Sequence, residues 1–297
     1  MAITTDQDNK PVAHIEPLEQ LARFSWENAR SLCRPEDGCV DYHQTWSMVR
    51  LLQLGGALPA GVEFFRRELG ALALAGKTRV LVSGGADAGV TAMVAHSYLA
   101  VGVQPHITFV DRCETSCEQN RMLLRELGIE GEVRCMDATQ IDGGPFDAIV
   151  WHSFLHFFDG VQRTLLLGAW GRVLAPGGVM VMSTPLAPND AEWTRIADPV
   201  SIEERRSALV AAAVHAGWPH QEATELGARA AAAWSVSGRR APALTRQVFV
   251  DTLAQAGFEL RSIDIHEPIP SPSNLGTPVG KRRYRAEAIA VRPGALS

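Results

Sequence analysis

A glycine-rich turn is the first feature of the sequence that could hold a ligand. The segment RVLVSGGADAGVTAMVAH, residues 79–96, runs from an apolar strand through Gly84, Gly85 and Gly89 into a helix. Glycine lets the backbone approach a ligand closely, and the exposed N–H groups at the start of a helix favour polar or anionic groups. Turns of this kind bind phosphates, flavins and nicotinamide cofactors, so the turn alone predicts a ligand site without identifying the ligand.

Aspartates end the next two predicted strands. Asp111 closes the strand at 107–111, and Asp137 follows the strand at 132–136. The spacing from the glycine turn to Asp111 suits a carboxylate that accepts hydrogen bonds from both hydroxyls of a ribose. Asp137 has a plainer alternative role, because an aspartate after a strand often caps the turn that follows. Ligands of open α/β sheets bind at the carboxyl ends of the strands, so both residues are candidates for the site.

His152 is the preferred candidate for a general base. It follows the predicted strand 148–151 within FDAIVWHSFLHFF, and a neutral imidazole can accept a proton near pH 7. Ordering of the pocket or of a neighbouring backbone group is the alternative role for this residue. His156, one turn further along the chain, is a second candidate of the same kind.

A further group of candidates shares one face of a predicted helix. Tyr42, Trp46 and Arg50 are spaced four residues apart, and His43 lies beside them. If this helix covers the ligand, it presents an aromatic wall and a cation. Arg50 would then pair with a carboxylate, and Tyr42 or His43 would meet the substrate. The alternative is ordinary helix packing, with Arg50 at the rim of the contact.

The elements that position these residues alternate between strand and helix from residue 79 onward, a rhythm typical of parallel βαβ units. Apolar runs predict strands at 79–83, 107–111, 132–136, 148–151, 179–184, 258–266 and 283–291, and amphipathic runs predict helices at 90–100, 114–127, 161–173 and 246–256. Four prolines lie between the last two strands, which favours an antiparallel pair joined by a long loop.

Helical segments accompany this alternating core. Residues 1–78 have helical periodicity and are predicted to form an N-terminal cap, so residues 79–297 are predicted to form the ligand-binding domain. Alanine-rich helices at about 186–245 are predicted as an insertion over the sheet edge after the fifth strand. The insertion carries tryptophans that would form either a substrate lid or a satellite core, namely Trp193, Trp218 and Trp234.

Composition and charge exclude nucleic acid as the expected partner. The 297 residues are 46% hydrophobic and 21% charged, as in ordinary globular proteins, and the formal net charge is −5. An acidic protein repels phosphate backbones weakly instead of attracting them. The single dense basic cluster is Lys281, Arg282, Arg283 and Arg285, which we expect at the solvated end of a hairpin, with contact to an anion as the alternative.

Cysteine usage and hydropathy favour the cytoplasm and free thiols. No apolar stretch approaches the ~20 residues of a membrane span, and the N-terminus is polar. The cysteine count of five is odd and argues against a disulfide framework. Cys33 and Cys39 are six residues apart and Cys113 and Cys117 four, so neither pair has the C-x-x-C spacing of a zinc site, and no metal is expected.

Taken together, the order of these segments resembles the class I S-adenosylmethionine-dependent methyltransferase family over about residues 79–184, with weaker agreement through the final hairpin. RVLAPGG is similar to the turn before the fifth strand of that family, and FDAIVWHSFLHF is similar to its fourth-strand motif. The resemblance implies an α/β fold with a doubly wound, seven-stranded, mostly parallel Rossmann-like sheet. It also implies S-adenosylmethionine as the cofactor.

The resemblance assigns roles to individual residues. In this pattern the glycine turn lines the methionine part of the cofactor, the acid after the second strand holds the ribose, and the third strand end flanks the adenine. The corresponding residues are Gly84, Gly85, Asp87 and Gly89; Asp111 with Arg112; Asp137 with Ala138; and, at the reaction side, Trp151 and His152. Arg50 joins the expected cofactor ligands because its helix would cover the cofactor and place it near the methionine carboxylate. Many members carry an acid where this chain has Val82, and Asp87 is expected to supply that carboxylate instead.

The function implied is methyl transfer to a small molecule of secondary metabolism, with an oxygen, nitrogen or carbon acceptor left open. Alternatives are an enzyme that uses the sulfonium for another displacement such as cyclisation, a noncatalytic binder of the cofactor, and a nicotinamide-dependent oxidoreductase, although no G-x-G-x-x-G turn is present. A base-methylating motif is absent after the fourth strand, where histidine and serine also disfavour magnesium. A homodimer is one expected assembly of the chain.

Overall fold

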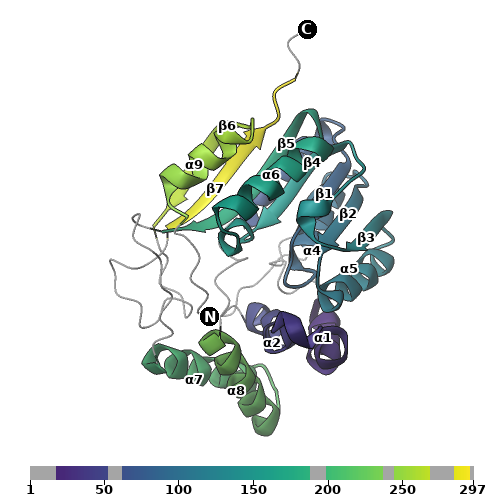
Figure 1. Ribbon diagram of the computed structural model, residues 1–297. Coiled ribbons are helices and arrows are strands. Elements are labelled where there is room, and N and C mark those ends of the chain that lie inside the picture. Colours follow the sequence, from purple (N-terminus) through teal and green to yellow (C-terminus); the bar gives the residue numbers. More distant parts are fainter. Residues whose placement is uncertain (1–17, 53–61, 188–198, 237–243, 268–283, 295–297) are drawn as a thin grey trace.

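The computed structural model describes residues 18–52, 62–187, 199–236, 244–267 and 284–294. Its centre is a seven-stranded sheet in the order β3-β2-β1-β4-β5-β7-β6 (Figure 1). The strands are β1 (Arg79–Ser83), β2 (His106–Asp111), β3 (Gly131–Cys135), β4 (Phe146–His152), β5 (Leu174–Leu186), β6 (Glu259–His266) and β7 (Tyr284–Val291). The predicted strands therefore all exist, and the sheet has the Rossmann-like methyltransferase topology that the resemblance implied.

Strand directions follow the prediction as well. β1 to β5 pair in parallel, whereas β7 runs antiparallel to both β5 and β6. The chain builds outward from β1 to β3 and then returns to place β4 on the other side of β1. This reversal creates a topological switch point at the carboxyl ends of β1 and β4, which is where open α/β sheets bind ligands.

Helices cover both faces of the sheet. On one face α3 (Val62–Leu74), α4 (Gly89–Leu99) and α5 (Glu114–Glu126) pack over side chains such as Val80 and Val82. On the other face α6 (Gly160–Val173) and α9 (Arg246–Gln255) pack over alternate positions such as Leu81. The burial of successive strand residues on opposite faces explains why the strands read as continuous apolar runs.

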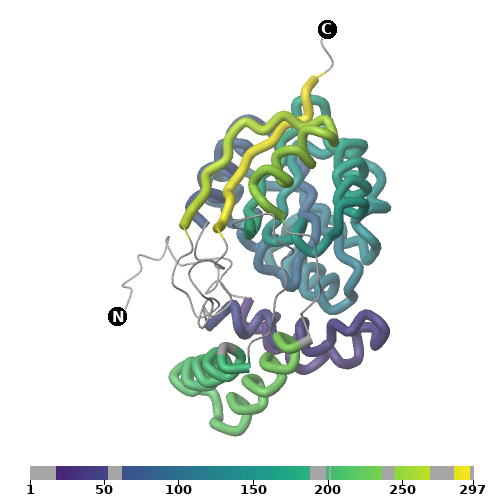
Figure 2. The backbone as a smooth tube through the Cα atoms, turned by 60° about the vertical axis from the view of Figure 1, so that its left-hand side comes forward, coloured from purple at the N-terminus to yellow at the C-terminus, as the bar shows by residue number. Residues whose placement is uncertain are grey.

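A second helical layer lies beyond the carboxyl ends of the parallel strands (Figures 1 and 2). It consists of α1 (Leu18–Leu32) and α2 (Val40–Leu51), drawn in purple, beside α7 (Pro199–His215) and α8 (His220–Val236), drawn in green. The predicted insertion after β5 therefore packs against the N-terminal helices. The buried residues shared by the four helices are Ala22, Met48, Val49, Leu209, Ala213, Ala223, Leu226 and Ala230.

The tryptophans of the insertion take part in this helical contact. Trp218 and Trp234 pack against the shared core, and the guanidinium of Arg23 lies over the Trp218 ring. Arg229 of α8 lies over the ring of Trp26 in the same way. These contacts correspond to the satellite core, while Trp193 lies outside the described residues.

The N-terminal helices divide between two environments. α3 packs on α4 and belongs to the layer that covers the sheet, whereas α2 contacts α8 in the second helical layer. The domain division at residues 78 and 79 stays a prediction. Among the described helices, none combines the length and the apolar character required to cross a membrane.

Candidate functional site

The glycine turn after β1 adopts a conformation that suits glycine alone. Gly84 has φ +74°, and its N–H donates to the Val110 oxygen at 2.8 Å. A Cβ at this position would lie 2.3 Å from the ring of Phe154. The next N–H, that of Gly85, donates to Asp111 Oδ2 at 3.1 Å. The turn is therefore held directly against the end of β2.

We expect Gly84→Ala to destabilise the protein and to weaken cofactor binding. Gly102→Ala is the matched control, because Gly102 has the same φ of +74° but an added Cβ would meet nothing within 4 Å. Gly102→Ala measures only the loss in unfolding free energy from placing alanine at a positive φ, about 1–2 kcal/mol. Gly84→Ala should lose more than this, because its added Cβ would also meet the Phe154 ring. Urea unfolding measures both, and equal losses would show that the close approach of Phe154 contributes nothing.

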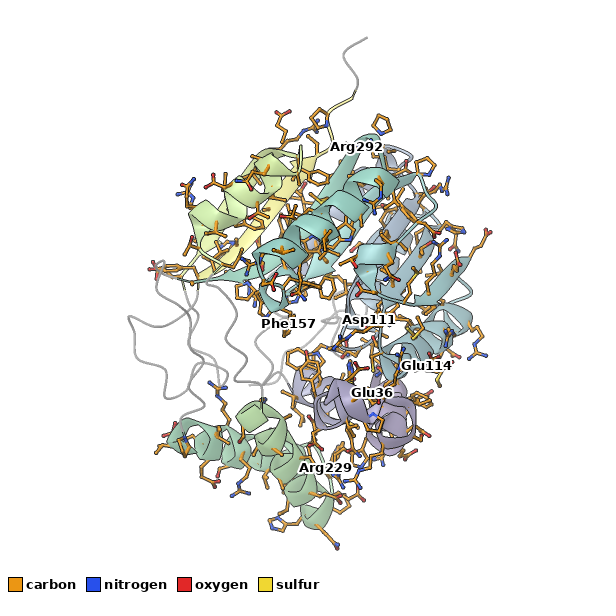
Figure 3. The ribbon with its side chains drawn as sticks, in the orientation of Figure 1. Glu36, Asp111, Glu114, Phe157, Arg229 and Arg292 are labelled. Atoms are coloured by element: carbon orange, nitrogen blue, oxygen red, sulfur yellow. The ribbon has the colours of Figure 1, made fainter. Side chains whose placement is uncertain are left out.

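Asp111 connects the end of β2 to the glycine turn. Its Oδ1 accepts from the Cys113 N–H at 2.8 Å, and its Oδ2 accepts from Gly85. Burial raises the pKa of this carboxyl above its ordinary value, against the two backbone hydrogen bonds. Figure 3 shows Asp111 at the sheet edge that faces the helical layer, with Arg292 at the opposite edge. Each carboxylate oxygen still has lone pairs for further donors.

A buried ion pair joins the helical layer to the same turn. Arg50 Nε of α2 lies 2.7 Å from Asp87 Oδ2, and the two side chains are 2% and 4% exposed. Asp87 Oδ1 also accepts from the Gly89 N–H at 2.9 Å, at the start of α4. Arg50 Nη1 is buried and has no hydrogen-bond partner in the structure. An arginine donor left without a partner in a buried site is available to an anionic ligand group.

The predicted face of α2 is only partly directed to this site. Tyr42 and Trp46 pack together with ring centroids 5.4 Å apart, and they lie two turns and one turn before Arg50, respectively. His43 is buried, and its Nδ1–H donates to the Ala86 oxygen in the glycine turn at 3.0 Å. His43 therefore stabilises the glycine turn through a hydrogen bond to its backbone.

His152 at the end of β4 is held by an arginine from β7. Arg285 Nη1 lies 3.0 Å from His152 Nε2, 3.3 Å from Ser153 Oγ and 3.1 Å from Ser183 Oγ. A guanidinium can only donate, so His152 Nε2 is the acceptor and the imidazole is neutral. Ser153 has a φ of 51°, which is rare outside glycine and marks a backbone fixed by its surroundings.

Arg285 is the functional candidate that sequence reasoning missed. It belongs to the basic cluster expected at a solvated hairpin end, yet burial lowers the pKa of its guanidinium to about 10. The antiparallel register places it opposite Pro185 of β5, next to the end of β4. That register was the available signal, because it follows only from pairing β7 with β5. Lys281, Arg282 and Arg283 lie outside the described residues.

Phenylalanines add an apolar boundary that the sequence did not single out. Phe65 of α3 lies with its ring centroid 6.3 Å from that of His152. Phe154 covers Gly84 and packs edge-on against Phe158, with centroids 4.9 Å apart. Phe157 is 60% exposed at the same sheet edge, where Figure 3 labels it. His152 and the glycine turn therefore border on aromatic side chains.

Other predicted residues lie elsewhere or are already engaged. Trp151 is fully buried on the α6 face, with its ring stacked on Trp170, so it does not lie at the sheet edge as we expected. Asp137 Oδ1 accepts from both the N–H and the hydroxyl of Thr139, which is the capping role. Ala138 next to it is buried, and exposed Arg112 lies 3.8 Å from Asp37.

Comparison with known proteins is consistent with this arrangement. Residues 80–178 match a family model described as a methyltransferase domain. A geranyl diphosphate methyltransferase in complex with GPP and sinefungin is similar in structure, with a TM-score of 0.50, 16% identity, and coverage of 79% of this chain and 77% of that chain. At this identity the likeness shows the fold alone.

More distant structural likenesses have lower scores. The magnesium protoporphyrin IX methyltransferase from Synechocystis PCC 6803 with bound SAM has a TM-score of 0.45 and 12% identity, over 78% of this chain and 79% of that chain. The cyclase SpnF has a TM-score of 0.47 and 15% identity, over 77% and 81%. Among curated proteins no sequence matches the chain.

Proposed function

We infer, from the methyltransferase-domain model that residues 80–178 match, that this chain is an S-adenosylmethionine-dependent methyltransferase acting on a small molecule. The observation that carries the proposal is the hydrogen bond between Asp111 and the Gly85 N–H, 3.1 Å long. It fixes a carboxylate beside a glycine turn at the switch point of the sheet. That arrangement suits a ligand with a ribose next to a polar chain.

The residues at this edge fit the cofactor. Asp111 would bind the ribose hydroxyls, because its oxygens retain acceptor capacity. Arg50 would bind the methionine carboxylate through Nη1, the buried donor that lacks a partner. Gly84 and Gly85 would let the backbone approach the ligand, where a side chain would collide with Phe154 or Phe109. When bound, the cofactor supplies a methyl group on a positively charged sulfur.

At the reaction side, we assign His152 the role of a neutral imidazole held in one orientation by Arg285. Its Nε2 accepts from the guanidinium at 3.0 Å and is therefore not available to take a proton from a substrate. This contact favours the pocket-ordering role over general-base catalysis. Phe65 and Phe154 would exclude water and give the acceptor an apolar surface, which supports a small organic substrate.

Replacing His152 tests this role once an acceptor has been found with labelled cofactor. We expect His152→Ala to lower kcat by about 10-fold or more with little change in cofactor affinity, because the orientation of the pocket is lost. His152→Gln should retain most of the activity, since an amide can also accept from Arg285. If both variants lost activity equally, and a pH-dependent step vanished with them, His152 would be the base instead.

The by-product distinguishes methyl transfer from the alternatives. S-adenosylhomocysteine is expected after turnover, whereas methylthioadenosine would mean that the sulfonium serves another displacement such as cyclisation. Consumption of neither cofactor nor acceptor would favour a noncatalytic binder. The proposal also includes a cytoplasmic location, which cell fractionation tests, and a homodimer, which size-exclusion chromatography tests.

A further inference from the structure

Three of the five cysteines converge beside the glycine turn. Cys33 Sγ lies 3.6 Å from Cys113 Sγ, and Cys39 Sγ lies 3.9 Å from it. All three sulfur atoms lie within 4.8 Å of one another, and the residues are buried or half-buried. Cys33 follows α1, Cys39 precedes α2, and Cys113 precedes α5. Residues that are up to 80 positions apart in the sequence therefore form one cluster.

The sulfur separations match those around a tetrahedral zinc ion. Zinc binds thiolate sulfur at about 2.3 Å, and a tetrahedron with that radius has edges of about 3.8 Å. The separations of Cys33 Sγ and Cys39 Sγ from Cys113 Sγ, 3.6 and 3.9 Å, lie on either side of this value. A disulfide requires about 2.05 Å between its sulfur atoms, and it would leave the third thiol over. The cluster thus suits a shared ion better than a pairwise bond.

Two neighbouring side chains border the cluster. His43 follows Cys39 by four residues on α2, and its Nδ1–H donates to the Ala86 oxygen in the glycine turn at 3.0 Å. The Thr115 hydroxyl lies 3.1 Å from Cys33 Sγ and can donate a further hydrogen bond to that thiolate.

We propose that Cys33, Cys39 and Cys113 bind a Zn²⁺ ion. Three thiolates fill three of the four positions of a tetrahedral zinc site and leave one position for a further donor. The ion would fasten α1 and α2 to the loop between β2 and α5. Because the N–H of Cys113 donates to Asp111 Oδ1 at 2.8 Å, the site would also hold the Asp111 carboxylate in place beside the glycine turn. The three ligands act as positioning residues.

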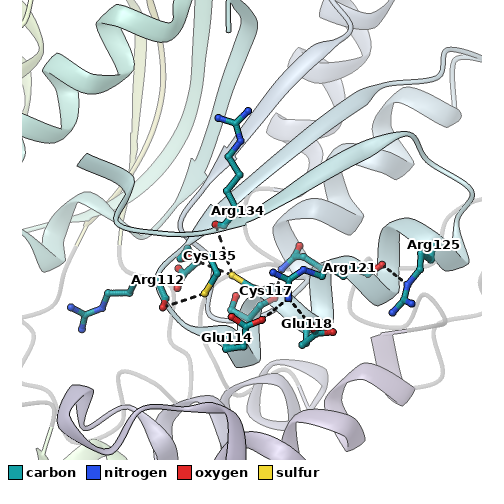
Figure 4. A network of polar contacts seen from close by, with 11 residues as sticks. Arg112, Glu114, Cys117, Glu118, Arg121, Arg125, Arg134 and Cys135 are labelled. Atoms are coloured by element: carbon teal, nitrogen blue, oxygen red, sulfur yellow. Dashed lines mark hydrogen bonds and ion pairs between the residues drawn. The ribbon is translucent and has the colours of Figure 1, made fainter. Parts of the chain in front are cut away.

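The remaining two cysteines provide matched controls. Figure 4 shows Cys117 beside Arg134 and Cys135 beside Arg112. Cys117 Sγ lies 3.3 Å from the backbone oxygen of Asp111, and Cys135 Sγ lies 3.5 Å from the backbone oxygen of Arg112. Neither belongs to the three-sulfur cluster. Replacing either one removes a thiol near the site without removing a proposed ligand.

Metal analysis of the full chain tests the proposal. The protein is produced in medium with added zinc, purified without chelator and analysed by plasma mass spectrometry. We expect about one zinc per chain in the unsubstituted protein and in Cys117→Ser and Cys135→Ser, and a loss of at least tenfold in Cys33→Ser and Cys113→Ser. Zinc retained in full by the last two variants would overturn the site.

Cobalt substitution keeps the test decisive if the cysteine variants fail to fold. The unsubstituted apoprotein titrated with Co²⁺ should give the visible absorption of tetrahedral cobalt with strong thiolate charge-transfer bands, and added Zn²⁺ should abolish them. The absence of both zinc and these bands would overturn the proposal. An intact mass lower by two hydrogens, with no bound metal, would replace it by a disulfide within the cluster.

Discussion

Replacing Asp111 by alanine is expected to weaken binding of S-adenosylhomocysteine by about 100-fold or more. The ionised carboxylate would accept a hydrogen bond from each of the two ribose hydroxyls. A hydrogen bond to a charged group contributes about 1.5–3 kcal/mol. Two such bonds correspond to at least a hundredfold in affinity, since each 1.4 kcal/mol is a factor of ten. Isothermal titration calorimetry measures the change.

Asp147→Ala is the control for this substitution. Asp147 also accepts a backbone hydrogen bond, from the Arg79 N–H at 2.9 Å, but Arg79 begins β1 and so lies at the opposite end of the sheet. We expect Asp147→Ala to bind the ligand normally. Near-normal affinity in folded Asp111→Ala would remove the ribose assignment, and circular dichroism would establish that the variant is folded.

Arg50→Met is expected to lower the free energy of unfolding by about 3–5 kcal/mol. The substitution would leave the Asp87 carboxylate in a buried site without its cation, and an uncompensated buried charge is strongly destabilising. Adding Asp87→Asn to Arg50→Met should recover most of that loss, because the amide is neutral and can still accept from Gly89. Urea unfolding of the single and double variants measures both effects.

Cofactor affinity separates the two roles of Arg50. If Nη1 binds the methionine carboxylate, the double variant should regain stability but still bind S-adenosylhomocysteine weakly. The matched control for the stability loss is Arg206→Met, because Arg206 pairs with Glu203 on the exposed surface of α7. This substitution should lower the free energy of unfolding by less than about 1 kcal/mol. A double variant with normal affinity would limit Arg50 to a structural role.

The fold followed closely from the sequence because burial on both faces of a parallel sheet leaves a clear pattern. β1 was predicted with its observed bounds, and the other strands within a few residues, apart from β5, which begins five residues earlier than expected. The extra length of β5 includes Pro176, Gly177 and Gly178, which read locally as a turn. Within this stretch only Leu174 pairs with β4, and the register shifts before Val179. Gly177 has a φ of +73°, so the predicted turn exists inside the bounds of β5.

The site followed from the sequence only where its residues end strands or share a helix. Asp111, Gly84 and the Tyr42–Trp46 contact are examples of local signals. Arg285 could not be placed, because its position beside His152 depends on the pairing of β7 with β5. The fully buried Trp151 was misplaced because strand alternation turns it to the face opposite that of Val150.

The cysteine cluster shows the same limit. A C-x-x-C motif signals zinc within a few residues, whereas Cys33 and Cys39 are separated from Cys113 by 80 and 74 residues. Only the docking of the N-terminal helices onto the β2–α5 loop brings the thiols together. The roles of the individual site residues and the domain division stay predictions that the proposed experiments address.

The most direct test of the account is a calorimetric titration of the unsubstituted, folded chain with S-adenosylhomocysteine. We expect saturable binding of one ligand per chain, with no comparable heat from NADH. A flat titration by well-folded protein would contradict the methyltransferase proposal at its base, because the carboxylate of Asp111 beside the glycine turn would then have no nucleoside to hold.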